Sequence, residues 1–563
     1  MANNAGNLPS TLNRSRSSIV FLNEETTAGK IATHPTTLTR FGLTTPPVIG
    51  QAGNYTDTSE IGPELISVDR VLNYMDYSTF DFEYYAKPGG RGSSTPIDLT
   101  PNATLTLTAG ALSGGLYPIT VGDLVTDPGI ILNDGDTISV TYSGVTTEHI
   151  VTTSTAAGFT FTFSSRTQMN VVGNLSAVSK VGAIVEAEEG EILYRTLGGR
   201  KYLSSGDGGY AQGASNTTNV TSANATAIQY FLANSVNTFT VTSRQFTDQA
   251  VQMYTSTGAL PTSWSVSLAK DGPVTFTTGF QANRVFYTGT AELNNAGPIT
   301  LASGADTTVT VTYPLRAAND TAAVAEDIAF YQSLSTKGSL VKVRDSAGTE
   351  QGPFEVVAIS GATVTLDTDD TNSNGATGSG VALPAGNTFL IPYTPEPCPD
   401  TASLLDQKSV QAYMADQMTG SGLSPDGATF DDLFHVDNAL DVTAVSFDFD
   451  RSVTTPGLTE MTGEEFPPAS YVINEPTITG SITLLLRPKD FQLMNSIRAV
   501  PHRAIGVEIG TTAGSRIQIA APSCFLEVPT PGDADGATQI DIPFTVVRGA
   551  ECEDADKFLV RYF

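Results

Sequence analysis

Residues 439–457 read ALDVTAVSFDFDRSVTTPG, and residues 475–495 read EPTITGSITLLLRPKDFQLMN. Apolar residues alternate with Thr, Ser and Asp along 442–450 and again along 477–487. Alternation with a period of two is typical of a β-strand with one face on a core. These two stretches therefore predict a pair of half-buried strands, and they decide how the rest of the chain is interpreted.

A helix follows the second of these strands. Residues 488–499 begin with Pro488, which a helix tolerates in its first turn, and carry Phe491, Met494 and Asn495 at helical spacing. Between the two strands lies a long irregular stretch, 451–475. The predicted order is strand, long loop, strand, helix, and then short strands near residues 505, 516, 524 and 541.

The same series occurs earlier in the chain. A strand at 37–45 precedes a long loop at 46–74, a strand at 76–86 and a helix at 182–197, and strands follow near residues 238, 250, 262 and 274. Two series in one chain predict an internal duplication. A weaker helical pattern lies at 401–418.

Strand patterns dominate the whole chain and predict a mainly β, antiparallel protein. Further segments with alternating or β-rich sequence lie at 159–163, 238–244, 262–268, 274–281, 505–511 and 538–547.

Two stretches interrupt the duplicated series. Each is much longer than the ~12 residues expected of a structureless loop and is rich in short strand patterns, so each is predicted to fold as a small β-module. The predicted organisation has a first repeat divided by an inserted module, then a second module, then a second repeat, with boundaries at 1–95, 96–168, 169–300, 301–398 and 399–563.

Charge argues against a nucleic-acid-binding protein. The 563 residues include 58 acidic and 29 basic residues, a formal net charge of −29. Duplex binding normally depends on Lys and Arg that neutralise phosphates. The same sign suits a passage through which DNA slides without adhering, although acidity also simply keeps a protein soluble.

No pattern in the sequence indicates an enzyme, a metal site or a cofactor. The three cysteines form no CxxC motif and are consistent with reduced thiols in a cytosol. None of the four histidines lies in a metal-binding spacing or beside a Ser or Cys that could act as a nucleophile. Asp370, Asn372, Asn374 and Gly375 match the opening of a calcium loop, but Val381 occupies the position of the bidentate Glu. We interpret that segment as a polar turn. Neither a signal peptide nor a membrane anchor is visible.

The order of elements resembles the tail tube fold of bacteriophage tails. The segments that carry the resemblance are the two stretches quoted first together with GDADGATQIDIPFTVV at 532–547, and in the earlier series IGPELISVDRVLNYMDYSTFDFEYYA at 61–86 and residues 239–281. The resemblance covers about 300 residues and excludes both modules. It implies a duplicated tail-tube fold, with an antiparallel β-sandwich or barrel and one helix in each copy.

The resemblance also implies a function. Such subunits form rings whose inner strands line a channel, and their long loops reach the next ring of a stacked tube. We therefore expect a virion structural protein of a phage with a flexible, non-contractile tail, assembled in the cytoplasm of a host bacterium. Its partners would be further copies of itself, as a trimer with pseudo-sixfold symmetry or as a hexamer, and other tail proteins at the tube ends. The alternative is an extracellular β-rich adhesion or receptor-binding protein.

Two groups of residues are candidates within this interpretation. The polar positions of the strands at 76–86 and 477–487 are predicted to face the channel: Asp81, Glu83, Thr479, Ser481 and Thr483. The charged residues of the long loops are predicted to make contacts between rings: Glu60, Glu64, Asp69, Arg70, Arg451, Glu460, Glu464 and Glu465. Alternation fixes the two faces of a strand but not which one is inward, and both groups could instead face bulk solvent on the outside of the protein.

Overall fold

The computed structural model describes most of residues 18–562; its larger gaps are 30–38, 59–68, 205–226, 313–339, 394–403, 417–432, 455–470 and 548–557, with shorter gaps elsewhere. Strands hold 65% of the described residues, and one α-helix is present among them. The prediction of a mainly β, antiparallel protein is confirmed.

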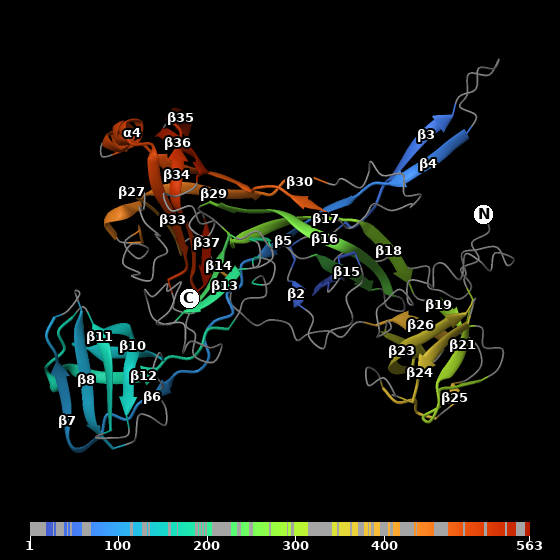
Figure 1. The fold of residues 1–563 in the computed structure, drawn as a ribbon, viewed down its shortest axis with the longest axis horizontal. Helices are drawn as coiled ribbons and strands as arrows, with labels where there is room; N and C mark the ends of the chain where they lie inside the picture. The colour runs from blue at the N-terminus through green and yellow to red at the C-terminus, as the bar shows by residue number, and fades with distance from the viewer. Residues whose placement is uncertain are drawn as a thin grey trace.

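The main body is an 18-stranded antiparallel sheet that includes a curled half-barrel. Its strands come from two parts of the chain, residues 18–289 and 410–562 (Figure 1). They are β1 (Ser18–Glu24), β2 (Thr39–Phe41), β5 (Ser78–Tyr85), β13 (Arg200–Ser204), β14 (Ala227–Phe231), β15 (Phe239–Phe246), β16 (Val251–Leu268), β17 (Thr275–Ala282), β18 (Arg284–Gly289), β27 (Val410–Asp416), β28 (Ala439–Leu440), β29 (Val442–Asp450), β32 (Thr477–Leu485), β33 (His502–Ile509), β34 (Ile517–Leu526), β35 (Thr530–Ala534), β36 (Ala537–Val546) and β37 (Leu559–Tyr562).

Six strands form a continuous run at the centre of this sheet. They pair in the order β5, β17, β16, β29, β32 and β36, each antiparallel to the next. The pair β16–β29 joins the predicted first and second repeats. Strand β37 joins them a second time, because it pairs with β14 on one side and β34 on the other.

One hydrophobic core lies behind the six-stranded run. Trp264 is fully buried and packs on Phe276 of β17 and on Phe558, which precedes β37. Phe447 of β29 contacts the same Phe558 and also Phe544 of β36. Because residues from both predicted repeats meet in one core, the segments assigned to them pack as a single body.

A separate seven-stranded sheet forms the first inserted unit, with its own buried core around Phe161 and Phe163. Its strands are β6 (Thr95–Pro96), β7 (Pro101–Ala109), β8 (Tyr117–Leu124), β9 (Thr137–Tyr142), β10 (Val145–Thr155), β11 (Thr160–Ser165) and β12 (Leu175–Lys180). The sheet thus extends past residue 168. Its neck is a pair of crossing segments in which the amide of Gly92 donates to the carbonyl of Ala183 at 2.8 Å.

The second unit is a closed barrel. It consists of β19 (Ala291–Leu293), β21 (Thr307–Thr312), β22 (Leu340–Arg344), β23 (Glu350–Ser360), β24 (Thr363–Asp367) and β26 (Thr388–Pro392), with a small two-stranded sheet of β20 (Ile299–Thr300) and β25 (Ala382–Leu383) beside it. The barrel therefore begins before residue 301. Ile391 and Phe389 of the barrel pack on Met253 of β16 and so fix it to the main body.

The helical predictions had mixed outcomes. Helix α4 (Asp490–Ala499) confirms the helix expected at 488–499. The helix expected at 401–418 is wrong, because 410–416 is strand β27, which pairs along its full length with β33. In 182–197, Gly190, Leu193 and Thr196 are helical, but Ile184 forms an extended bridge with Arg91.

Candidate functional site

One face of the six-stranded run carries polar and acidic side chains and is exposed or half-buried. The alternation of burial along β5 and β32 places their polar residues on this face and their large apolar residues in the core. One row of paired residues crosses all six strands: Glu83, Thr277, Ser265, Asp448, Thr479 and Thr545. A second, parallel row consists of Asp81, Gly279, Ser263, Asp450 and Thr477.

The five residues predicted to face a channel lie together on this polar face. Asp81 and Glu83 come from β5, and Thr479, Ser481 and Thr483 come from β32. Strands β17, β16 and β29 lie between them in the sheet. The prediction that this face lines a channel is not tested by the fold of one chain and stays a prediction.

Three acidic residues of the face were missed by the sequence analysis. Asp448 and Asp450 are exposed on β29, and Asp541 is exposed on β36, where the hydroxyl of Thr483 donates to it at 3.0 Å. The sequence pattern could have identified Asp448 and Asp450, because they occupy alternate positions on the polar face of a predicted strand. The sequence did not predict which strands pair with β32.

The face is negative and contains no cation. None of the six strands contains Lys or Arg. The hydroxyl of Thr44 donates to the side-chain carboxyl group of Glu83 at 2.6 Å. Desolvation raises the pKa of Asp448 above its ordinary value. A face of this kind repels phosphates and offers them no row of Lys or Arg side chains.

Two arms leave the same end of the six-stranded run. The first is a hairpin of β3 (Gly53–Thr58) and β4 (Asp69–Met75), and the base of the second is the short pair β30 (Val453–Thr454) and β31 (Val472–Ile473). The expectation of irregular loops is therefore wrong for the ends of both segments, which pair as strands. Figure 1 shows β3 and β4 extending beyond the body and β30 running toward them.

Hydrogen bonds place both arm bases next to the bend at Asn283, between β17 and β18, which both pair with β16. The side-chain amide of Gln51 donates to Asn283 at 2.9 Å, and the hydroxyl of Tyr471 donates to Gly258 at 2.6 Å. Gly258 and Asn283 are neighbours, because the amide of Asn283 donates to Thr257. The two arms thus share one region of the molecule.

The structure describes only some of the charged residues that were predicted to make contacts between rings. Glu60, Glu64, Glu460, Glu464 and Glu465 lie outside the described residues, and Asp69 and Arg70 begin β4, where only their backbone is described. The expected place of Arg451 on an exposed loop is wrong. Its side chain is 1% exposed and lies over the ring of Phe449, and burial lowers its pKa to about 10.

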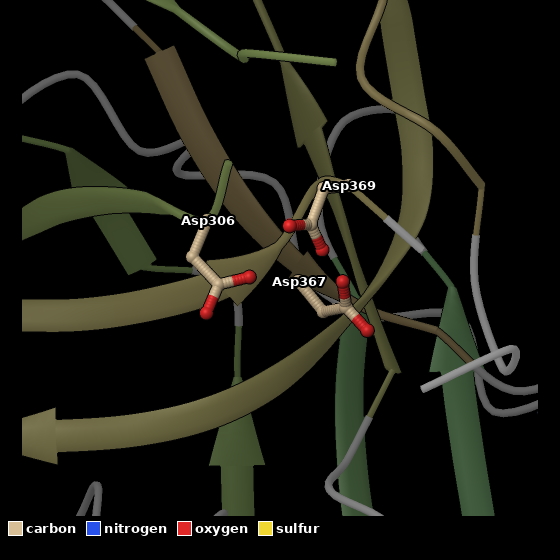
Figure 2. A group of neighbouring side chains, drawn as sticks. All are labelled: Asp306, Asp367 and Asp369. Atoms are coloured by element: carbon tan, nitrogen blue, oxygen red, sulfur yellow. The ribbon is translucent and has the colours of Figure 1, made fainter. Parts of the chain in front are cut away.

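Three carboxylates meet at one edge of the barrel unit (Figure 2). Asp306 precedes β21, Asp367 ends β24 and Asp369 follows it, and their oxygens lie within 4.8 Å of one another. Desolvation, and then the charges of Asp369 and Asp367, raise the pKa of Asp306. Hard cations favour such oxygens, but exposed acidic groups of this kind are common without an ion. Asp370, Asn372, Asn374 and Gly375 lie outside the described residues.

Comparison with known proteins gives no family for the chain: neither a protein-family model nor a curated protein matches it. In the part of the chain that the structure describes, no helix has the length and apolar character needed to cross a bilayer.

Proposed function

We propose that this protein is the tube-forming subunit of a long-tailed phage tail, in which two copies of a tail-tube fold in each chain build stacked rings around a negatively charged channel. The observation that carries the proposal is the continuous polar face shared by both repeats, with acidic and hydroxyl side chains on one side of the sheet and a common core on the other. The proposal assigns no catalytic residue and no cofactor to the chain.

The order of strands supports an internal duplication. In the first repeat the segment around Leu43 pairs with β5, β5 with β17, and β17 with β16. In the second, β29 pairs with β32, β32 with β36, and β36 with β35. Each series is a strand, a return strand after an arm, and a closing hairpin.

The junction between the repeats suggests how chains join. Within one chain, the outer edge of β16 pairs with β29, the first strand of the next repeat, over residues 263–268 and 445–450. The equivalent outer edge of the second repeat is β35, which pairs only with β36 among the described strands. The equivalent first strand is the segment 39–44. Residues 39–41 pair with β1 and Leu43 with Tyr84 of β5 in the same chain. Pairing of β35 with the edge of this segment that these contacts leave open in the next chain would repeat the internal junction and close a ring.

Within this proposal, the number of chains in a ring depends on how many repeats each chain contributes. Three chains with two repeats each would form a pseudo-sixfold ring, and a ring of six chains is the alternative. The acidic residues of the face would then recur around the channel, so DNA could pass through without being held.

The positions of the arms and of the smaller units agree with a stacked tube. Both arms leave one end of the sheet, as contacts to a neighbouring ring require. In Figure 1 the seven-stranded unit and the barrel both lie below the main sheet, away from the arm of β3 and β4. We assign them to the outer surface, where a non-contractile tail has no sheath to cover them.

Electron microscopy of the purified protein tests the proposal. Hollow tubes with repeating rings are expected, and end-on views distinguish three chains from six. A map of the tube should place Asp81, Glu83, Asp448 and Asp450 on the channel wall. Monodisperse particles that bind a sugar or a receptor would favour the adhesion alternative, and Asp81 and Glu83 on the outer wall would contradict the assignment of the channel.

A further inference from the structure

Glu25 lies in an enclosed site where distant segments of the chain meet. Its side chain is 5% exposed, and both of its oxygens are used. Oε2 accepts from the amide of Gly29 at 2.7 Å and the hydroxyl of Thr238 at 2.7 Å, and Oε1 accepts from the hydroxyl of Thr240 at 3.0 Å and the amide of Gly258 at 2.8 Å. A carboxylate is buried at tolerable cost only when donors surround it in this way.

Gly258 is the point at which β16 changes partners. Up to Ala259 β16 pairs with β15 and β18, and from Leu260 onward it pairs with β17 and β29. Its φ is 61°, a left-handed conformation that favours glycine. Its amide donates to Glu25 and its carbonyl accepts from Tyr471 at 2.6 Å, so one residue connects the carboxylate to the second arm.

Tyr471 also connects the two arms to each other. It immediately precedes β31, where the second arm returns, and its ring packs against Tyr77, which follows the first arm, with ring centroids 5.8 Å apart. Burial, with smaller effects of Tyr77 and Glu25, raises the pKa of the Tyr471 hydroxyl far above its ordinary value. The hydroxyl therefore stays protonated and able to donate.

We propose that Glu25, Gly258, Tyr471 and Tyr77 form an arm clamp, which fixes the bases of both arms on the first repeat and couples the two bases to each other. The second arm belongs to the second repeat in sequence, yet its base is held by residues of the first. The clamp is a property of a single chain. Only its use, which is to present both arms together to a neighbouring ring, rests on the proposed function.

Hydrogen exchange measured on the unassembled full chain tests the clamp. Tyr471→Phe removes the hydrogen bond to Gly258, and the longer one to Gln281 at 3.4 Å, and keeps the ring, whereas Tyr471→Ala also removes the contact with Tyr77. Tyr117→Phe, at a half-buried tyrosine of the seven-stranded unit, is the matched control. The amides to follow are those of Asn474 and Asp76, which donate to Ser452 and Ala52 at the arm bases.

Loss of the hydrogen bonding of the Tyr471 hydroxyl should speed exchange at Asn474 about fivefold in Tyr471→Phe. In Tyr471→Ala, exchange should also rise at Asp76, on the other arm. Tyr117→Phe should leave both amides unchanged. Unchanged exchange at Asn474 in both Tyr471 variants would overturn the clamp, and faster exchange at Asn474 alone in Tyr471→Ala would overturn the coupling of the arms. Absence of tubes for every variant and the wild type would contradict the proposed function and leave these exchange results to decide the clamp.

Discussion

At the scale of single residues, Glu25 couples folding to pH. Desolvation raises its pKa above the ordinary value of 4.5, and the hydrogen bonds from Gly258, Thr238, Gly29 and Thr240 only oppose that rise. A carboxyl group with a raised pKa in the folded state contributes stability that is fully present below its unfolded pKa. That contribution is lost as the pH rises through the folded pKa.

We expect the melting temperature of the wild type, relative to Glu25→Gln, to fall as the pH rises from 4 toward neutrality. The glutamine cannot titrate, so the difference between the two proteins isolates this one group. Thermal unfolding of both proteins over that pH range measures it. A difference that is constant with pH would show that Glu25 does not titrate differently in the folded and unfolded chains.

Gly480 is the residue at which the central sheet leaves least room. It lies opposite Phe447 of β29 and Phe544 of β36, and the two rings are in edge contact, 5.3 Å apart. A Cβ at this position would lie 2.2 Å from the carbonyl oxygen of Ser446 and 2.4 Å from the Phe544 ring. The backbone of β29 cannot move away without breaking its own pairing.

Gly480→Ala should therefore destabilise the protein by about 1–3 kcal/mol, the usual cost of overpacking. Denaturant unfolding measures the change. Gly173→Ala is the control, because a Cβ there meets nothing within 4 Å. Equal stability of the two variants would mean that the core around Phe544 adapts freely.

At the scale of elements, the arms are the parts whose length exceeds what the fold needs. A hairpin of β3 and β4 could close with a two-residue turn. The segments 59–68 and 455–470 add length beyond the paired bases, and the proposal gives them contacts with the neighbouring ring.

Replacing either 59–68 or 455–470 with Asn-Gly should leave a folded, soluble subunit that forms single rings or none. Circular dichroism confirms the fold of each variant, and negative-stain microscopy with sedimentation measures assembly. Tubes of normal length from both shortened proteins would contradict the role of the arms.

At the scale of the whole molecule, the seven-stranded unit is attached through a narrow neck. The amide of Gly92 lies 2.8 Å from the carbonyl of Ala183, and a side chain at Gly182 would collide with Gly92. The unit has its own core and contributes no strand to the main sheet.

Removing residues 93–182 and joining the neck with a short glycine linker should leave tubes that are thinner but otherwise normal. Insertions at exposed connections are the ones whose loss a fold survives best. Width and ring spacing in electron micrographs provide the measurement. A deletion protein that stays soluble and forms no tube would show that this unit takes part in assembly.

Much of this molecule was determined by the sequence itself. Alternation along 442–450 and 477–487 predicted strands β29 and β32 and the two faces of each, because side-chain direction in a strand follows from the local backbone. The Pro488 start predicted α4 for the same local reason. The same patterns placed Asp81 and Thr479 on the polar faces of their strands.

Only the tertiary structure decided which strands are neighbours. Residues 410–416 have a helical pattern but form β27, because pairing with β33 outweighs a weak local preference. Asp448 and Asp541 join Thr479 on one face, and Arg451 turns inward over Phe449. The arm bases likewise depend on Glu25, Gly258 and Tyr471, which are far apart in the chain. Such contacts depend on how distant segments pack, and no periodicity in a single segment encodes its partner.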